Sequence, residues 1–270
     1  MNYQSVALHK NAGILTLTLL GPSKGNAMGP EFWDELPSAI DDITAMADVK
    51  VVVVRGSGAN FSYGLDLPRM MPKMALSIGP NTKGEQRRDL MRMVRQMQLG
   101  FLKMHQSPKP FIAAIHGWCI GGGLNMISAA DIRLCSADAK FSLREARLAI
   151  TPDIGGLQWL PTIIGQGYTR ELAFTAKDFD ADYAQKIGLV NHVYATPEDL
   201  FAEAQKMAEQ IAENSSMAVQ GAKEVLNYGQ GKDIEAGLQY VAVWNSSQLQ
   251  SADFQEAIVA SLEKRKPVYQ

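Results

Sequence analysis

The sequence predicts an α/β fold followed by a helical C-terminal region. Stretches with strand periodicity alternate with stretches of helical periodicity through residues 1–196, whereas residues 197–264 hold no strand candidate and show the pattern of three or four helices. Such alternation is typical of a parallel sheet joined by right-handed crossovers. We therefore expect a core over residues 1–196 and a helical region over residues 197–270. This region is too thin to bury a core of its own, so we expect it to pack on the first part or on a neighbouring subunit.

The first half of the expected core begins with a β-hairpin, because apolar and polar side chains alternate over residues 6–20 around Asn11-Ala12-Gly13. An apolar stripe at helical spacing follows Pro30, and the run Val-Lys-Val-Val-Val-Val-Arg that begins at Val49 is typical of a buried strand. We expect, in order, a helix over residues 30–46, a strand over 49–55, a loop over 61–67, an irregular segment over 68–84 and a long helix over 85–106.

The second half of the core continues the alternation. The apolar run from Phe111 to His116 predicts a short buried strand, and a helix is expected from Leu124 onward. Further strands are expected over residues 132–135, 141–143 and 189–194, with helices over 169–176 and 181–186. The last helix of the chain, over residues 252–265, would place four apolar side chains on one face: Phe254, Ala257, Ile258 and Leu262.

Composition excludes several classes of function. The chain is 46% hydrophobic and 20% charged with a net charge of -2, and it has no basic stripe, so we expect no nucleic-acid partner. No apolar run reaches the roughly 18 residues of a membrane span, and strand-like alternation begins without a signal peptide. We therefore expect a cytoplasmic protein with no membrane partner. Cys119 and Cys135 have no metal or redox spacing and the four histidines are scattered, so we expect no metal site.

The run Gly121-Gly122-Gly123 is the most informative local feature. We expect it to lie where the strand over residues 111–116 turns into a helix, a point that exposes backbone N–H groups with partial positive charge. Without side chains, these residues let a ligand touch the backbone. Such a turn holds an anion, or an oxygen that becomes anionic during a reaction. Residues 64–66 offer a second backbone N–H, although Asp66 also suits the cap of a helix.

Three features have alternative interpretations. The glycine run lacks the Gly-x-Gly-x-x-Gly order of a dinucleotide site. His116 has apolar neighbours and suits a hydrogen-bonded core histidine better than a base. Methionines suit either the lining for an acyl chain of variable length or core filler, and seven of them gather in one stretch: Met70, Met71, Met74, Met91, Met93, Met97 and Met104.

Glu145 and Asp153 are the candidates for acid–base chemistry. Pro152 disfavours a helix at the preceding residue, so the two carboxylates do not share one continuous helix. Asp153 has apolar neighbours and precedes Gly155-Gly156, an expected helix start. The alternative is structural: Asp153 would cap that helix and Glu145 would be a salt-bridged surface residue.

Six segments resemble, in their order, the motifs of the crotonase superfamily, also called the enoyl-CoA hydratase/isomerase family, over nearly the whole chain. The resemblance implies a core of repeated ββα units, a C-terminal trimerisation region and a coenzyme A thioester substrate whose oxygen binds the backbone N–H groups of Leu65 and Gly122. The segments are Asn26-Ala27-Met28, residues 51–55, Phe61-Ser-Tyr-Gly-Leu-Asp66, His116-Gly-Trp-Cys-Ile-Gly-Gly-Gly, Ala130-Asp131-Ile132-Arg133 and Gly188-Leu189-Val190.

Position 125 bears on the reaction. The hydratases of this family resemble the chain at Glu145 but carry a glutamate where this chain has Asn125, and an amide is no general acid or base near pH 7. The dienoyl-CoA isomerases resemble it more closely, because they match both Glu145 and Asp153, although they carry an aspartate at position 125. Their reaction moves the double bonds of a 3,5-dienoyl-CoA to the 2,4 positions, with a proton leaving C2 and another arriving at C6.

The resemblance therefore implies a dienoyl-CoA isomerase without a metal or redox cofactor. Glu145 would be the base at C2, Asp153 the acid at C6, and Asn125 a hydrogen-bonding orienter. The alternatives are a hydratase or other enzyme on a different acyl-CoA, and a non-catalytic binder of CoA thioesters. A homotrimer or homohexamer is expected. The substrate-binding positions that the motifs imply are Lys24, Ala27, Tyr63, Gly64, Asp66 and Gly121.

Overall fold

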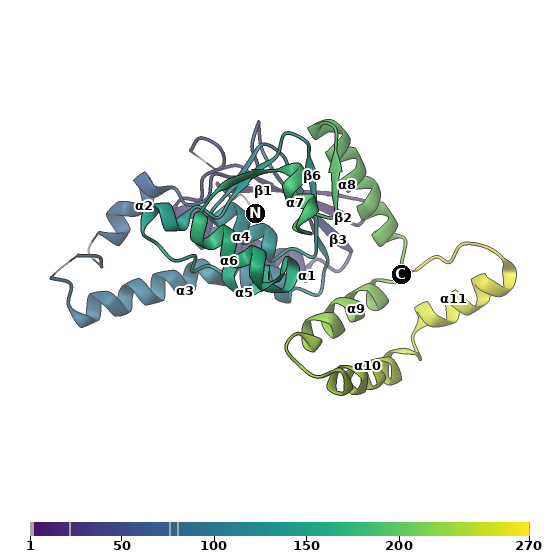
Figure 1. Ribbon diagram of the computed structural model, residues 1–270. Helices are drawn as coiled ribbons and strands as arrows, with labels where there is room; N and C mark the ends of the chain where they lie inside the picture. Colours follow the sequence, from purple (N-terminus) through teal and green to yellow (C-terminus); the bar gives the residue numbers. More distant parts are fainter. Residues whose placement is uncertain (1–2, 22, 76, 80, 270) are drawn as a thin grey trace.

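A six-stranded sheet lies at the centre of the computed structural model, in the order β1-β2-β3-β4-β6-β9 (Figure 1). The first two strands form the predicted antiparallel hairpin, and every later strand pairs in parallel with its neighbour. This confirms the α/β class. The strands are β1 (Val6–Asn11), β2 (Ile14–Leu19), β3 (Val51–Gly56), β4 (Phe111–Ile115), β6 (Ile132–Ser136) and β9 (His192–Tyr194).

The structure describes residues 3–21, 23–75, 77–79 and 81–269. The expected core and helical region also included Met1, Asn2, Pro22, Leu76, Pro80 and Gln270, which lie outside the described residues.

A second, three-stranded sheet contains two strands that the hydrophobic pattern did not predict. Its order is β5 (Trp118–Ile120), β7 (Lys140–Ser142) and β8 (Asp178–Asp180). The chain leaves β4, turns at Gly117 with a φ of +54°, and enters β5 before it reaches the glycine run. The expectation that the strand over residues 111–116 turns directly into the helix is therefore wrong. A three-residue strand is too short to show a period of two.

Helices cover both faces of the central sheet because its strands are apolar on both sides. Val52 and Val54 of β3 pack in the larger core, whereas Val51 and Val53 pack against α8 (Pro197–Ala212) on the other face. The remaining helices of this body are α1 (Pro30–Ala45), α2 (Leu67–Met74), α3 (Gly84–Gln106), α4 (Gly122–Ser128), α5 (Gly156–Ile163), α6 (Gly165–Thr175) and α7 (Ala181–Lys186).

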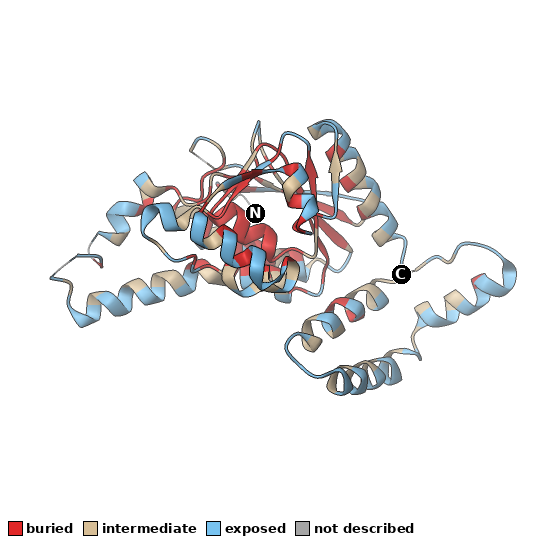
Figure 2. Cartoon of the chain, in the orientation of Figure 1, coloured by how far each residue is buried: buried red, intermediate tan, exposed pale blue. Residues whose placement is uncertain are grey.

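The last three helices extend away from the sheet as an arm, whereas α8 packs on it (Figure 1). The arm consists of α9 (Ser216–Gly229), α10 (Ile234–Gln248) and α11 (Ala252–Glu263), and most of its surface is exposed (Figure 2). Its anchor is the buried Lys223, whose ammonium donates to the Met104 and Lys109 carbonyls and to the Asp131 carboxylate at 2.9 Å. The prediction of three or four C-terminal helices is confirmed, and the assembly role of residues 197–270 stays a prediction.

Candidate active site

One cavity of about 500 Å³ is lined by the predicted oxyanion-binding residues Leu65 and Gly122 and by both predicted carboxylates. The loop before α2, the wall of α3, the turn after β5 and the segment between β7 and α5 all contribute to it. Its lining is mostly apolar, with one carboxylate from each end of the last segment. The lining residues are Tyr63, Leu65, Leu67, Met97, Trp118, Ile120, Gly121, Gly122, Arg144, Glu145, Leu148, Ile150, Asp153 and Ile154.

The first loop is held in place on both sides of Leu65. Met28 donates its backbone N–H to the Gly64 carbonyl at 2.7 Å and accepts from the Asp66 N–H at 3.1 Å. The buried Asn26 amide adds hydrogen bonds to the carbonyls of the segment just before this loop. Consequently the position of the Leu65 amide is set by backbone geometry and does not depend on a mobile side chain.

The second loop places the first amide of α4 at the cavity. Gly121 has a φ of +49°, a left-handed conformation that favours glycine, and donates to the Ser142 carbonyl at 2.9 Å. Gly122 is the first residue of α4, so its N–H lacks an acceptor within the helix.

The two loops touch each other. A Cβ added at Gly64, whose φ is +74°, would lie 2.8 Å from the Gly122 nitrogen and 2.5 Å from the Ile120 carbonyl oxygen. Across the described part of the chain, neither the Leu65 nor the Gly122 amide donates a hydrogen bond. Two unpaired N–H groups therefore line one cavity from adjacent loops, an arrangement that suits an oxygen on which negative charge develops.

Glu145 begins a single 3₁₀ turn that ends at Leu148, and it faces a buried amide. Its Oε1 accepts from Nδ2 of Asn125 at 2.7 Å, and its Oε2 is buried without a hydrogen-bond partner. Burial raises the pKa of the Glu145 carboxyl above its usual value, the Asn125 hydrogen bond opposes that rise, and the Asp153 charge adds to it. No ion pair among the described residues includes Glu145, so the salt-bridge alternative is wrong.

Asp153 lies beyond Glu145 in an irregular segment, as the proline predicted. The residue is exposed overall, yet burial of its carboxyl group at the cavity raises the pKa of that carboxyl. The N-cap of α5 is Gly155, so the alternative in which Asp153 caps this helix is wrong. The carboxylates thus occupy one cavity and share a direction of pKa shift, which is common where protons are exchanged.

The other predicted site residues lie around this cavity and do not line it. Asn125 is fully buried behind Glu145. The Gly64 carbonyl, next to the Leu65 amide, accepts from the Met28 N–H. Asp66 caps α2 by accepting from the Arg69 N–H at 3.3 Å. Ala27 is buried next to this loop, whereas Lys24 is exposed. Substrate contacts of these residues stay predictions.

Several lining residues were not singled out from the sequence. Trp118 and Ile120 have the same parity on β5, so both face the cavity, and the Arg144 guanidinium lies 5.3 Å above the Trp118 ring centre. Trp118 and Ile120 both lie within the motif His116-Gly-Trp-Cys-Ile-Gly-Gly-Gly, from which only the glycines were predicted to contribute to the site. Of the seven clustered methionines, Met97 alone lines this cavity, so the acyl-lining idea has one supporting residue.

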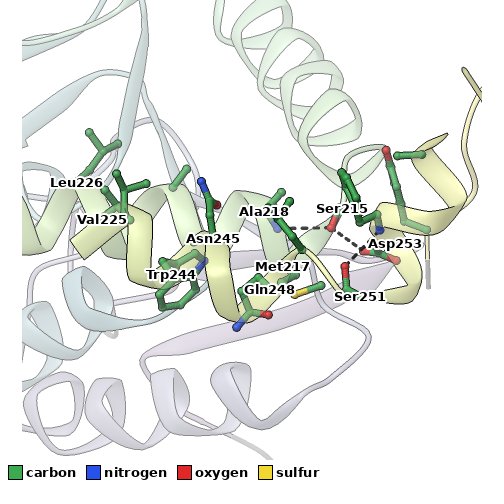
Figure 3. Close-up of a pocket in the computed structure, with 17 residues that line it drawn as sticks. Ser215, Met217, Ala218, Val225, Leu226, Trp244, Asn245, Gln248, Ser251 and Asp253 are labelled. Carbon is green, nitrogen blue, oxygen red and sulfur yellow. Dashed lines mark hydrogen bonds between the residues drawn. The ribbon is translucent and has the colours of Figure 1, made fainter. Parts of the chain in front are cut away.

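A second cavity, of about 570 Å³, lies within the arm and carries no comparable chemistry (Figure 3). Apolar side chains such as Met217, Leu226 and Trp244 line it, and its one carboxylate, Asp253, accepts from the Ser215 hydroxyl at 2.5 Å. It is therefore a gap between helices of the arm and no candidate for acid–base catalysis.

Other expectations can be compared with the described residues. His116 is buried and its Nε2 lies 2.9 Å from the Gly58 carbonyl oxygen, which confirms the core histidine. Both cysteines are buried and free. In residues 3–269, apart from the three undescribed positions, no cluster of three or more His, Cys, Asp or Glu could hold a metal ion. Over the same residues, no helix is both long and apolar enough to cross a membrane.

Comparison with known proteins identifies the family. A family model described as enoyl-CoA hydratase/isomerase matches residues 9–270. A mitochondrial Δ(3,5)-Δ(2,4)-dienoyl-CoA isomerase from Dictyostelium discoideum is 40% identical and matches 99% of this chain and 92% of its own length. A peroxisomal enzyme of the same name from Arabidopsis thaliana is 40% identical over 95% of this chain and 92% of its own. A short-chain-enoyl-CoA hydratase from Clostridium acetobutylicum is 31% identical over 98% of this chain and 97% of its own.

These names contradict the cytoplasmic location expected from the sequence, since the dienoyl-CoA isomerase relatives are mitochondrial or peroxisomal. The expectation rested on strand-like alternation near the first residues and on the lack of a long apolar run, and neither observation specifies a compartment. Among solved structures, an enoyl-CoA hydratase from Bacillus anthracis superposes with a TM-score of 0.89 and 30% identity, covering 98% of this chain and 99% of that one. The chain therefore has the crotonase fold and belongs to the enoyl-CoA hydratase/isomerase family of enzymes.

Proposed function

We propose that this enzyme converts 3,5-dienoyl-CoA to 2,4-dienoyl-CoA. The observation that supports this most strongly is the presence of Glu145 and Asp153 in the cavity that the free Leu65 and Gly122 amides also line. The two relatives that are 40% identical carry the name of this activity, whereas the hydratase relative is 31% identical.

In the proposed mechanism the thioester oxygen accepts from the Leu65 and Gly122 N–H groups. Glu145 removes a proton from C2, and the electron pair of that C–H bond delocalises toward the oxygen to give a trienolate. Fixed N–H dipoles stabilise this charge without reorganisation, and one such donor is typically worth about 2.7–4 kcal/mol of barrier. The unpartnered Oε2 of Glu145 is the atom available for the proton.

Collapse of the trienolate forms the new double bonds at C2 and C4, while the electron pair of the old C5 double bond takes a proton at C6 from Asp153. One proton enters Glu145 and one leaves Asp153, so the composition of the substrate does not change and solvent restores both carboxyl groups. The raised pKa of Asp153 supports its role as an acid. We propose no metal or redox cofactor, because the reaction moves only protons and double bonds.

Asn125 would act as a positioning residue. Its amide donates to Glu145 and cannot take up a proton, so the two-carboxylate addition of water by a hydratase lacks one of its carboxyl groups. For the thioester substrate we propose contacts with Lys24, Ala27, Tyr63, Gly64, Asp66 and Gly121, of which Tyr63 and Gly121 line the cavity.

We further propose that the arm assembles copies of the chain into a trimer or a hexamer. The support is its exposed apolar surface, which includes Leu226, Ile234 and Leu262, each more than 70% exposed in the single chain. A lone chain with such a surface is unusual.

The decisive assay incubates the protein separately with a 3,5-dienoyl-CoA and a 2-enoyl-CoA and follows the absorbance of each product. Formation of the conjugated 2,4-dienoyl-CoA without hydration of the 2-enoyl-CoA is the expected result. Hydration alone would favour a hydratase, and binding of both thioesters without turnover would favour a non-catalytic binder.

A further inference from the structure

We infer that Gln98 of α3 is a positioning residue that places Asp153 for proton delivery to C6. This inference rests on the proposed isomerase function. The juxtaposition is a hydrogen bond of 2.6 Å from Nε2 of Gln98 to the backbone carbonyl oxygen of Asp153, between residues far apart in the sequence.

The segment that carries Asp153 is fixed at its two ends. At the first end, Ala149 adopts a left-handed conformation with a φ of +56°, and Ile150 donates its N–H to the Glu145 carbonyl at 3.1 Å. At the other end, Gly155 has a φ of +112° and is the N-cap of α5, and a Cβ there would lie 2.0 Å from the Trp159 ring.

Between these ends Pro152 and Ile154 are buried, and the segment has a single hydrogen-bonded tether. In the described structure, Gln98 is the only residue that forms a hydrogen bond with residues 151–154. Without this donor, the backbone at Asp153 would have no hydrogen-bonded partner in the protein. Packing of Pro152 and Ile154 would then hold the segment, and the carboxyl group could shift relative to the cavity.

Gln98 is suited to this role because α3 is firmly packed around it. Its neighbour Met97 is buried and lines the cavity, and Phe101 is fully buried against the Trp33 ring of α1 at a centroid distance of 5.7 Å. A Cβ at Gly100 would lie 2.7 Å from the Leu36 side chain, so α3 and α1 are in close contact. The side chain of Gln98 thus links a rigid helix to the backbone of the proposed acid.

The two proton transfers respond differently to the loss of this tether. Removal of the C2 proton requires Glu145 and the two amides, which Gln98 does not contact. Protonation at C6 requires Asp153 to be correctly placed, and a displacement of about 1 Å can cost about 100-fold in rate. Exchange of the C2 hydrogen and overall isomerisation therefore separate a positioning role from a general structural one.

The experiment compares Gln98→Met, which keeps the side-chain length and removes the donor, with Gln98→Glu, which keeps the shape but places a carboxylate against the carbonyl. Gln96→Met is the matched control, because Gln96 lies on the same helix and its Nε2 reaches the Trp33 carbonyl instead, at 3.5 Å. Asp153→Asn is the reference for a missing acid. Each enzyme is incubated with a 3,5-dienoyl-CoA in D₂O, and both product formation and deuterium at C2 of recovered substrate are measured.

We expect both Gln98 variants to lower kcat for isomerisation by about 10- to 100-fold with little change in KM, while C2 exchange is retained. Gln96→Met should behave as wild type. Full isomerisation by both Gln98 variants would overturn the inference, and so would an equal loss of isomerisation and C2 exchange. In either case the proposed function stands if Asp153→Asn does not isomerise the substrate. Full isomerisation by Asp153→Asn would overturn the proposed function itself.

Discussion

Nδ2 of Asn125 lies 2.7 Å from Oε1 of Glu145 and 2.8 Å from the carbonyl oxygen of Gly121. Both partners are acceptors, so the orientation of the amide is determined: its NH₂ group faces them and its Oδ1 faces Gly156, where a Cβ would lie 2.0 Å away. A neutral donor therefore touches the proposed base. It favours the ionised carboxylate and opposes the rise in pKa that burial causes.

This contact predicts the pH dependence of Asn125 variants. Glu145 must be deprotonated to act as a base, so activity falls as the pH drops through its pKa. Asn125→Leu removes the donor and raises that pKa, which moves the acidic limb of the kcat/KM profile to higher pH. Asn125→Asp moves it in the same direction because a second carboxyl group repels the charge. Profiles measured against wild type test this, and an acidic limb that stays in place would show that the hydrogen bond does not control the base.

The two carboxylates are predicted to be necessary for turnover but not for binding. Glu145→Gln and Asp153→Asn should each lower kcat by about 10²–10⁴-fold, the usual effect of removing a general base or acid. Neither change removes the Leu65 or Gly122 amide, so the affinity for a CoA thioester should stay close to that of wild type. Steady-state kinetics and calorimetric binding of a non-reactive acyl-CoA are the measurements. A large loss of affinity would instead indicate that the carboxylates hold the substrate.

The contact between the two glycine loops predicts a specific sensitivity at Gly64. Gly64→Ala places a methyl group within 2.5 Å of the Ile120 carbonyl oxygen and 2.8 Å of the Gly122 nitrogen, so one of the two amides must move. Loss of one such donor would lower kcat by about 100- to 1,000-fold. Gly58→Ala is the control, since Gly58 also has a positive φ, of +63°, but has open space around it. Equal activity of the two variants would argue against an oxyanion site here.

Much of the fold could be predicted because the strongest elements carry local signals. The strand β3 is apolar on both faces, and α3 has a long stripe of apolar residues, so both were expected within one or two residues of their observed ends. Residues 68–84 were expected to be irregular, which is wrong for α2, a helix that forms although it contains Pro68 and Pro72. Pro68 lies in its first turn, where a missing N–H costs nothing, and Asp66 caps it.

Only the site residues that belong to sequence motifs could be predicted. The resemblance to the family implied that Leu65, Gly122, Glu145 and Asp153 share one site, whereas the local sequence left both carboxylates open to a structural role. The cavity brings the four residues together. The tether from Gln98 joins residues more than fifty positions apart and has no local pattern. Such contacts depend on how α3 packs, which periodicity does not specify.

Lys223 predicts how firmly the arm is attached. Its buried ammonium satisfies two carbonyls and the Asp131 carboxylate, so Lys223→Met would leave the two carbonyls without this donor, while the partly exposed Asp131 keeps the Phe111 N–H at 2.7 Å. Leaving buried acceptors without their donor in this way typically costs about 1–3 kcal/mol of unfolding free energy. Lys206→Met is the control, because the Lys206–Glu203 pair is exposed and should change stability by less than about 0.5 kcal/mol. Urea denaturation at one fixed protein concentration measures both, and equal midpoints would contradict the assignment of Lys223 as an anchor.

The exposed arm predicts the oligomeric state. Burying one large apolar side chain contributes about 1.5–3 kcal/mol, and association costs about 4–15 kcal/mol, so several such side chains are needed together. The arm offers several, including Leu226 at 73% exposure, which also lines the cavity in Figure 3.

Light scattering at micromolar concentration should give the mass of a trimer or a hexamer. Leu226→Asp should shift it toward smaller species, whereas Phe174→Asp, at an equally exposed position on α6, should not. A monomeric wild-type protein would reject assembly through the arm, since its apolar surface would then have no partner copy to cover it.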